Sequence, residues 1–149
     1  MQIGHISSLQ TITCHPDTTV LEAAELMRKH HVGNLVIVEE IEGVRMPMGI
    51  VTDRDIVVIV IAEGLDPKSI KVIDIMMTEL MTAVENEDVF ETVERMRFKG
   101  VRRIPIVNKQ GGLVGIVSVD DVWKCMAKQM TELAEVTTRQ QMREKTVRK

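Results

Sequence analysis

The chain has 149 residues, 44% of them hydrophobic and 28% charged, with a net charge of −3. That length suits one ordinary domain, and the mild negative charge argues against a nucleic-acid or anionic-membrane partner. The two cysteines, Cys14 and Cys125, do not have the spacing of metal ligands. Residues 1–10 do not have the features of a signal peptide. The longest apolar run, Ile56–Ala62, is too short to cross a bilayer. We therefore expect a soluble cytoplasmic protein with reduced thiols.

The first half predicts a strand, a helix and two further strands. The first strand lies near Leu9–Cys14. Thr19 and Glu22 then have capping-box spacing, in which a hydroxyl and a carboxylate satisfy free amides at a helix start. Strands rich in β-branched residues follow at Leu35–Val38 and Met48–Thr52. On the helix, three apolar residues are spaced to share one face: Val20, Ala24 and Met27.

The segment Ile56–Ile61 permits two interpretations. Its β-branched residues favour a strand. Three observations favour a helix instead. The negative charges of Asp53 and Asp55 at its start complement the helix dipole, and Gly64 is suited to its end. The matching segment of the second half also has good helix propensity. We therefore predict a helix, whose surplus apolar surface is expected to be buried against a second subunit.

The second half predicts the same order of elements. A short strand near Met81–Val84 precedes a helix that starts at Asp88 and Glu91, which again have capping-box spacing. Strands Ile104–Val107 and Leu113–Ser118 follow. The turn residues Gln110, Gly111 and Gly112 predict that these two strands form a hairpin. A second helix is predicted at Asp121–Lys128. The helix that starts at Asp88 has an apolar face made of Val89, Val93 and Met96.

An internal duplication explains this agreement. The phrase Gly49–Ile56 returns 66 positions later as Gly115–Val122, and the helices and strands before it repeat at a spacing of 69. We assign the three-residue difference between the two spacings to a longer loop at Glu39–Met48 in the first half, because insertions are tolerated best in loops. Each half alone would be marginally stable, so we expect the two to share a core. The expected parts are residues 1–66 and 67–130 as repeats and 131–149 as a basic tail, helical or frayed.

The duplicated unit resembles the CBS domain, and residues 5–130 resemble a tandem CBS pair. The resemblance rests on Pro16-Asp17-x-x-Val20, on the strand Arg102–Val107, and on the ending Gly-aliphatic-aliphatic-Thr/Ser-x-x-Asp in both copies. It implies an α+β fold in which two β-α-β-β-α repeats pack sheet to sheet in a pseudo-twofold disc. It also implies pairing of discs into homodimers, and clefts that bind AMP, ADP, ATP or adenosyl compounds to regulate a partner protein.

The two endings themselves suit a nucleotide. Thr52 with Asp55, and Ser118 with Asp121, place a hydroxyl and a carboxylate at a helix start. A carboxylate can accept hydrogen bonds from both ribose hydroxyls, while the hydroxyl and free helix amides face a phosphate. The alternative is that Asp55 and Asp121 only cap helices, as Asp commonly does.

The two clefts are expected to be unequal. Arg102, Arg103 and Pro105 stand in the second copy where the first has Gly33, Asn34 and Val36, and by the resemblance the basic positions reach phosphate. We therefore expect the second cleft to dominate, with Arg54 as a weaker cation in the first. For adenine, the candidates are aliphatic side chains and strand backbone: Ile12, Val36, Ile104 and Ile116, with backbone near Thr13 and Val84. Trp123 is expected at a dimer interface.

Enzymatic function has little support, because the sequence lacks the common nucleophile, P-loop, dinucleotide and zinc-protease motifs. We predict a non-catalytic regulatory module that senses an adenine nucleotide, needs no cofactor, and signals to an unknown partner. One alternative is an interaction module of the same fold with empty clefts. A weaker alternative is a metal-responsive variant that uses Cys14, His15 and one of His30 or His31, in a spacing that fits no standard zinc pattern.

Overall fold

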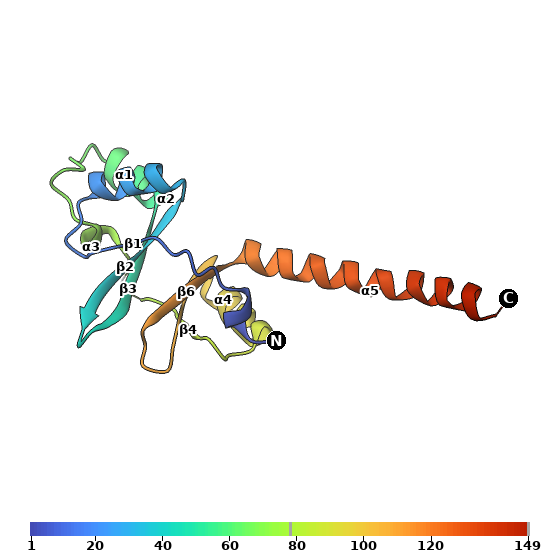
Figure 1. The fold of residues 1–149 in the computed structure, drawn as a ribbon. Coiled ribbons are helices and arrows are strands. Elements are labelled where there is room, and N and C mark those ends of the chain that lie inside the picture. The colour runs from blue at the N-terminus through green and yellow to red at the C-terminus, as the bar shows by residue number, and fades with distance from the viewer. Residues whose placement is uncertain (78, 149) are drawn as a thin grey trace.

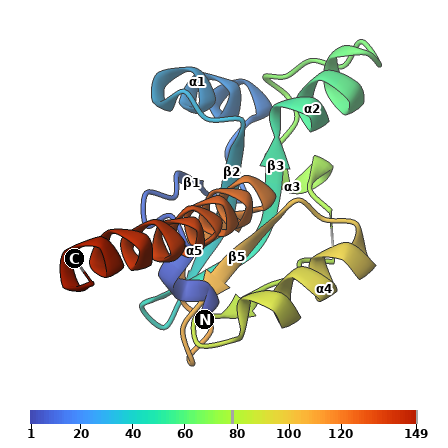
Figure 2. The same ribbon diagram turned by 90° about the vertical axis from the view of Figure 1, so that its right-hand side faces the viewer.

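The computed structural model describes residues 1–77 and 79–148, and it contains two three-stranded sheets with helices on their outer sides (Figure 1). A long C-terminal helix projects away from both sheets (Figure 1), and it points toward the viewer in Figure 2. In chain order the elements are η1 (Ile3–Ile6), β1 (Thr13–Cys14), α1 (Val20–His30), β2 (Asn34–Ile41), β3 (Val44–Thr52), α2 (Asp53–Asp55), η2 (Ile56–Ile61), α3 (Val72–Ile75), β4 (Ala83–Val84), α4 (Val89–Lys99), β5 (Arg103–Val107), β6 (Leu113–Ser118) and α5 (Val119–Val147).

The two sheets have the same topology. The strand orders are β1-β2-β3 and β4-β5-β6, and in each sheet the middle strand runs parallel to the first strand and antiparallel to the third. The sheets meet through β3 and β6. At the β5–β6 turn Gly111 has a φ of 83°, which favours glycine, and it lies against the end of the Met46 side chain of β3. The predicted α+β fold of two β-α-β-β-α repeats is confirmed.

Strand lengths differ from the sequence prediction in two places. β1 and β4 are only two residues long, whereas the predictions were Leu9–Cys14 and Met81–Val84. The segment Glu39–Met48 is not a loop, because β2 and β3 continue their ladder to the pair Ile41 and Val44. The hairpin closes on Glu42 and Gly43, both with positive φ. The exposed, charged residues Glu39 and Glu40 hid this extension of β2.

Helix starts follow the sequence closely. α1 has the predicted capping box, with Glu22 N donating to Thr19 Oγ1 at 3.1 Å and Thr19 N to Glu22 Oε2 at 2.9 Å. At α4, Asp88 accepts from the amides of Phe90 and Glu91, but no reciprocal bond from the Glu91 side chain is present between these described residues. The buried faces are shifted by one residue from the prediction, and comprise Val20, Ala23 and Met27 in α1, and Val89, Thr92 and Met96 in α4.

The segment Ile56–Ile61 is helical, as predicted, and its hydrogen-bonding pattern is that of a π-helix. The wider turn suits a run of β-branched residues, which crowd an α-helix. Gly64 follows with a φ of 68°, consistent with its predicted role at the helix end. Val57 and Ile61 are each 56% exposed, so this helix presents apolar surface to solvent.

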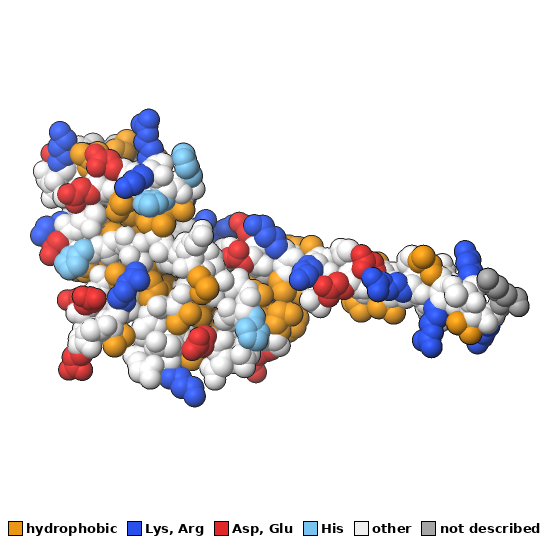
Figure 3. All heavy atoms as spheres, viewed as in Figure 1, with side chains coloured by type: hydrophobic (Ala, Val, Ile, Leu, Met, Phe, Trp, Pro, Cys, Tyr) orange, Lys and Arg blue, Asp and Glu red, His pale blue; other side chains and the backbone are white. Residues whose placement is uncertain are grey.

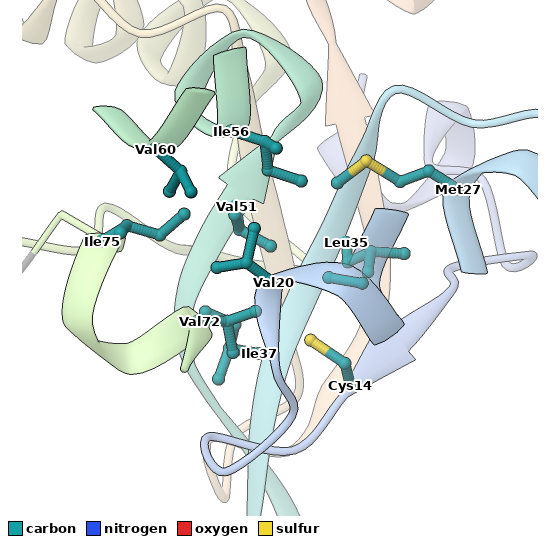
Figure 4. Close-up of a cluster of buried hydrophobic side chains, with 11 residues drawn as sticks. Cys14, Val20, Met27, Leu35, Ile37, Val51, Ile56, Val60, Val72 and Ile75 are labelled. Atoms are coloured by element: carbon teal, nitrogen blue, oxygen red, sulfur yellow. The ribbon is translucent and has the colours of Figure 1, made fainter. Parts of the chain in front are cut away.

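Two separate hydrophobic clusters replace the single shared core that we expected. The first cluster includes Val72 and Ile75 of α3, which the sequence places at the start of the second half (Figure 4). The second cluster includes Ile3 of η1, from the start of the first half. Backbone hydrogen bonds fix both segments, from Val72 N to Thr18 O and from Ile3 N to Glu87 O. Each repeat therefore completes its core with a segment taken from the other.

The C-terminal helix α5 has 29 residues and continues to Val147. Within residues 1–77 and 79–148, no helix combines the length and the apolar character needed to cross a membrane.

Candidate functional site

The Ser118–Asp121 pair lies where β6 passes into α5. Asp121 Oδ2 accepts hydrogen bonds from Ser118 N and from Ser118 Oγ, both at 2.8 Å, and Asp121 N donates to Ser118 Oγ at 3.2 Å. This is a capping box, so the capping role of the carboxylate is real. Asp121 Oδ1 has no hydrogen-bond partner among the described residues, and the side chain is only half-buried. One carboxylate oxygen therefore caps the helix while the other remains free for a ligand hydroxyl.

The Thr52–Asp55 pair repeats this geometry between β3 and α2. Thr52 N donates to Asp55 Oδ2 at 2.9 Å, and Asp55 N donates to Thr52 Oγ1 at 3.1 Å. Beside this pair, Asp53 adds a second carboxylate, and one of its oxygens lies 3.1 Å from the position that a Cβ on Gly33 would occupy. Arg54 is exposed, and its amide donates to Asp53 Oδ1. At the equivalent place the second site has Val119 and Asp120 instead of Asp53 and Arg54, so each site carries two neighbouring carboxylates and only the first has an arginine between them.

The two arginines of the second repeat lie in different places. Arg103 begins β5 and is paired in register with Ser118, whereas Asn34 holds the same position opposite Thr52. Arg102 is 4.0 Å from Asp120 and lines a hollow between α4 and α5 that does not include Asp121. The structure therefore places Arg103, but not Arg102, beside the Ser118–Asp121 pair.

A surface hollow of about 520 Å³ borders Asp121. Ligand pockets typically have volumes of about 300–1,000 Å³. Lys124 and Lys128 of α5 line this hollow, together with His5 of η1. At the equivalent positions, 66 residues earlier, the first repeat has Val58 and Ala62. The second site therefore has a nearby supply of positive charge that the first site lacks.

Sequence reasoning missed these three basic side chains. A signal was present for two of them, because Lys124 and Lys128 follow Asp121 by three and seven residues and so lie on its helix face. No local signal could have identified His5, since η1 reaches this hollow only through the exchange of segments between the repeats.

Strand alternation separates the residues proposed to hold adenine. Ile104 is fully buried in the second core, so its side chain is not available to a ligand, contrary to our expectation. Pro105 lies on the opposite face of β5, as alternate residues of a strand must, and pairs in register with Ile116, but its side chain is buried too. Val36, which pairs with Ile50 in the first sheet, is fully buried as well, so its side chain is not available to a ligand, contrary to our expectation.

Three further adenine candidates lie in or directly before the first strand of a sheet. Ile12 packs against the first core. Thr13 Oγ1 accepts a hydrogen bond from Arg45 at 3.0 Å, and Val84 N donates to Glu87 Oε1 at 3.0 Å. The amide of Val84 is therefore already occupied by a side chain of its own repeat.

The metal alternative gains nothing from the geometry of the described residues. No group of three His, Cys, Asp or Glu side chains within residues 1–77 and 79–148 is placed to hold an ion. Cys14 is buried in the first core, and His15 Nδ1 accepts from the amide of Asp17 at 3.1 Å. His30 and His31 lie at the end of α1, where His31 is the C-cap with a φ of 54°.

Burial raises the pKa of the Cys14 thiol to about 11, against a smaller opposing effect of its hydrogen bond with Thr18. In a Cys125→Ser variant at pH 8, we expect Cys14 to react with iodoacetamide roughly a hundred times more slowly in the folded than in the unfolded protein. The pKa of this thiol is higher in the folded than in the unfolded protein. Its contribution to the free energy of unfolding is therefore fully present below pH 9 and is lost as the pH rises from 9 to 11. Equal rates in the folded and unfolded protein would contradict the buried position.

Comparison with known proteins agrees with this architecture. The CBS domain family matches residues 3–62 and 72–122. An uncharacterized protein of Methanopyrus kandleri, MK0525, is 38% identical over 82% of this chain and 61% of its own length. The CBS domain-containing protein YhcV of Bacillus subtilis is 39% identical over 76% of each chain. The chain belongs to the CBS domain family.

Solved structures share the fold of the pair. The CBS domain pair of MJ0100, in complex with 5′-methylthioadenosine and S-adenosyl-L-methionine, is 29% identical with a TM-score of 0.72, covering 87% of this chain and 98% of that one. The CBS domain protein PAE2072 from Pyrobaculum aerophilum, complexed with AMP, is 26% identical with a TM-score of 0.72, covering 81% and 89%. A hexameric CBS-CP12 protein from cyanobacteria is 29% identical with a TM-score of 0.73, covering 83% and 66%.

Relatives with further domains are matched only in part. Inosine-5′-monophosphate dehydrogenase of Methanocaldococcus jannaschii is 32% identical over 76% of this chain but only 21% of the dehydrogenase. The chain also spans less than two thirds of MK0525.

Proposed function

We propose that this protein is a regulatory module that binds an adenine nucleotide in the cleft at Ser118–Asp121 and passes the bound state to a partner protein. The observation that carries the proposal is the free oxygen of Asp121 beside a hollow lined by Lys124, Lys128 and His5. A carboxylate that accepts ribose hydroxyls, next to cations that attract phosphate, fits a nucleoside phosphate. Solved CBS pairs in complex with AMP or with S-adenosyl-L-methionine support the same ligand class.

The second cleft is proposed as the main site. Asp121, Ser118 and Arg103 would contact ribose and phosphate, with Ile116 and the backbone at Pro105 against the base. In the first cleft Thr52, Asp55 and Arg54 would bind more weakly, because Asn34 stands where the second cleft has Arg103 and Val58 stands where it has Lys124.

The proposal also covers the setting of the module. Residues 1–66 and 67–130 act as the two repeats, and 131–149 as a tail outside the clefts. We propose a non-catalytic protein of the cytoplasm that needs no cofactor and self-associates. Free thiols at Cys14 and Cys125 support a reducing compartment, and the hexameric CBS-CP12 structure supports assembly. Net charge argues against nucleic acid as a partner.

A thermal-shift screen of the purified chain against AMP, ADP, ATP and S-adenosyl-L-methionine tests the ligand class. A ligand at a hundred times its dissociation constant stabilises the folded state by about 2.7 kcal/mol. We expect a clear rise in the melting temperature with at least one adenine compound and none with inorganic phosphate at the same ionic strength. No shift with any adenine compound at millimolar concentration would favour an interaction module with empty clefts.

A further inference from the structure

The last two thirds of α5 lack any packing partner within the described chain. From Met126 to Val147 every side chain is exposed, and the helix stands clear of both sheets (Figures 1 and 2). At about 1.5 Å per residue, its 29 residues span roughly 43 Å. Most of the stability of protein helices comes from packing of an amphipathic face, so a helix of this length needs a surface to cover it.

An apolar stripe runs the length of α5. Leu133 is 69% exposed and Val136 64%, and hydrophobic side chains recur along the protruding helix in Figure 3. Successive members are spaced by three or four residues, as in the seam of a coiled coil, with Gln129, Gln140 and Arg143 as polar interruptions. The apolar seam residues are Val119, Val122, Met126, Leu133, Val136 and Val147, and at its start the stripe joins the apolar hollow of about 550 Å³ between α4 and α5.

We propose that this stripe is covered by α5 of a second copy of the chain, packed antiparallel. Length selects the occupant, since α1 and α4 have only 11 residues each and cannot cover the stripe. Charge selects the direction. In the first turns of α5 Asp120 and Asp121 are balanced by Lys124 and Lys128, its middle carries Glu132 and Glu135, and its last turns carry an excess of basic side chains, namely Arg139, Arg143 and Lys145. Antiparallel packing brings opposite ends, and opposite helix dipoles, together.

One register satisfies the seam. If Leu133 packs on Val136 of the second copy, the same register places Gln129 on Gln140, Val122 on Val147, and Met126 against the aliphatic part of Arg143. The same register puts Glu132 beside Arg139 at the flank of the seam, twice per dimer. A parallel pair would instead set Arg143 against its own copy in the seam, where like charges repel. The antiparallel register therefore pairs the glutamines with one another and keeps the two Arg143 side chains apart.

Sedimentation velocity of the full chain tests the surface. Leu133→Glu should raise the dissociation constant of the dimer at least tenfold, because it places two carboxylates in the seam. Thr138→Glu, which adds the same charge on the opposite face of α5, should leave the constant unchanged. Equal association of the wild-type chain and Leu133→Glu would overturn the proposal. This measurement needs no nucleotide, so its result is independent of whether the proposed nucleotide site exists.

Charge reversal tests the direction of packing. Glu132→Arg alone and Arg139→Glu alone should each weaken association, because like charges then meet across the pair. The double variant should restore it. In a parallel pair Glu132 would face Thr137, so Glu132→Arg would have no effect and the double variant would stay as weak as Arg139→Glu. That outcome would overturn the antiparallel arrangement.

Discussion

Asp121→Ala should weaken binding of the adenine nucleotide by roughly ten- to a hundredfold. A hydrogen bond to a charged group contributes about 1.5–3 kcal/mol, and each 1.4 kcal/mol corresponds to a factor of ten in affinity. The free Oδ1 of Asp121 is the atom that would supply such bonds to ribose hydroxyls. Isothermal titration calorimetry with the nucleotide that gives the largest thermal shift measures the change.

The matched control is Asp55→Ala in the first repeat. Both variants remove the carboxylate of a capping box, so both should lose about 1 kcal/mol of folding stability. Only Asp121→Ala should change the affinity of the main site. If the two variants weakened binding equally, the clefts would be equivalent, and the charge difference made by Lys124 and Lys128 would have no consequence. If neither variant changed binding, the nucleotide would bind elsewhere.

Ile3→Ala should lower the free energy of unfolding by about 2–5 kcal/mol, although the residue is only the third in the chain. Ile3 is fully buried in the second core, and its amide donates to Glu87 O at 2.8 Å. Truncation of a large buried side chain leaves a cavity that its neighbours fill only in part. For a domain stable by about 5–15 kcal/mol, this loss is a large fraction of the total. Urea denaturation followed by circular dichroism measures it.

Leu9→Ala provides the comparison, because Leu9 is close in sequence but 75% exposed. Its effect should stay within about 0.5 kcal/mol. Hydrogen exchange should show that Ile3→Ala loosens β5 and β6 more than β2 and β3, since η1 packs on the second repeat. Equal loosening of both sheets would contradict the assignment of η1 to the second core.

Local pattern was sufficient for most elements. The capping box of Thr19 and Glu22, the turn at Gly111 and the paired endings at Asp55 and Asp121 are set by residues within four positions of one another, so their spacing is visible in the sequence. The helix at Ile56–Ile61 needed more, because its own propensity favours a strand and the matching segment of the second repeat decided the prediction. The extended hairpin near Glu42 was missed because its β2 arm, Glu39–Ile41, is exposed and mostly charged and so lacks the apolar alternation of a half-buried strand.

By itself, the sequence determined the order of elements and the two Ser/Thr-x-x-Asp pairs that make the candidate sites, because each depends on short-range spacing, and it determined the duplication because matching residues recur at a constant offset. The tertiary structure alone decided which segment completes which core, that Ile104 faces inward while Pro105 faces the other side, and that His5 lies near Asp121. These facts depend on the exchange of η1 and α3 between the repeats and on the register of paired strands. Both are long-range contacts, whose energies are set by burial of surfaces that are distant in the chain.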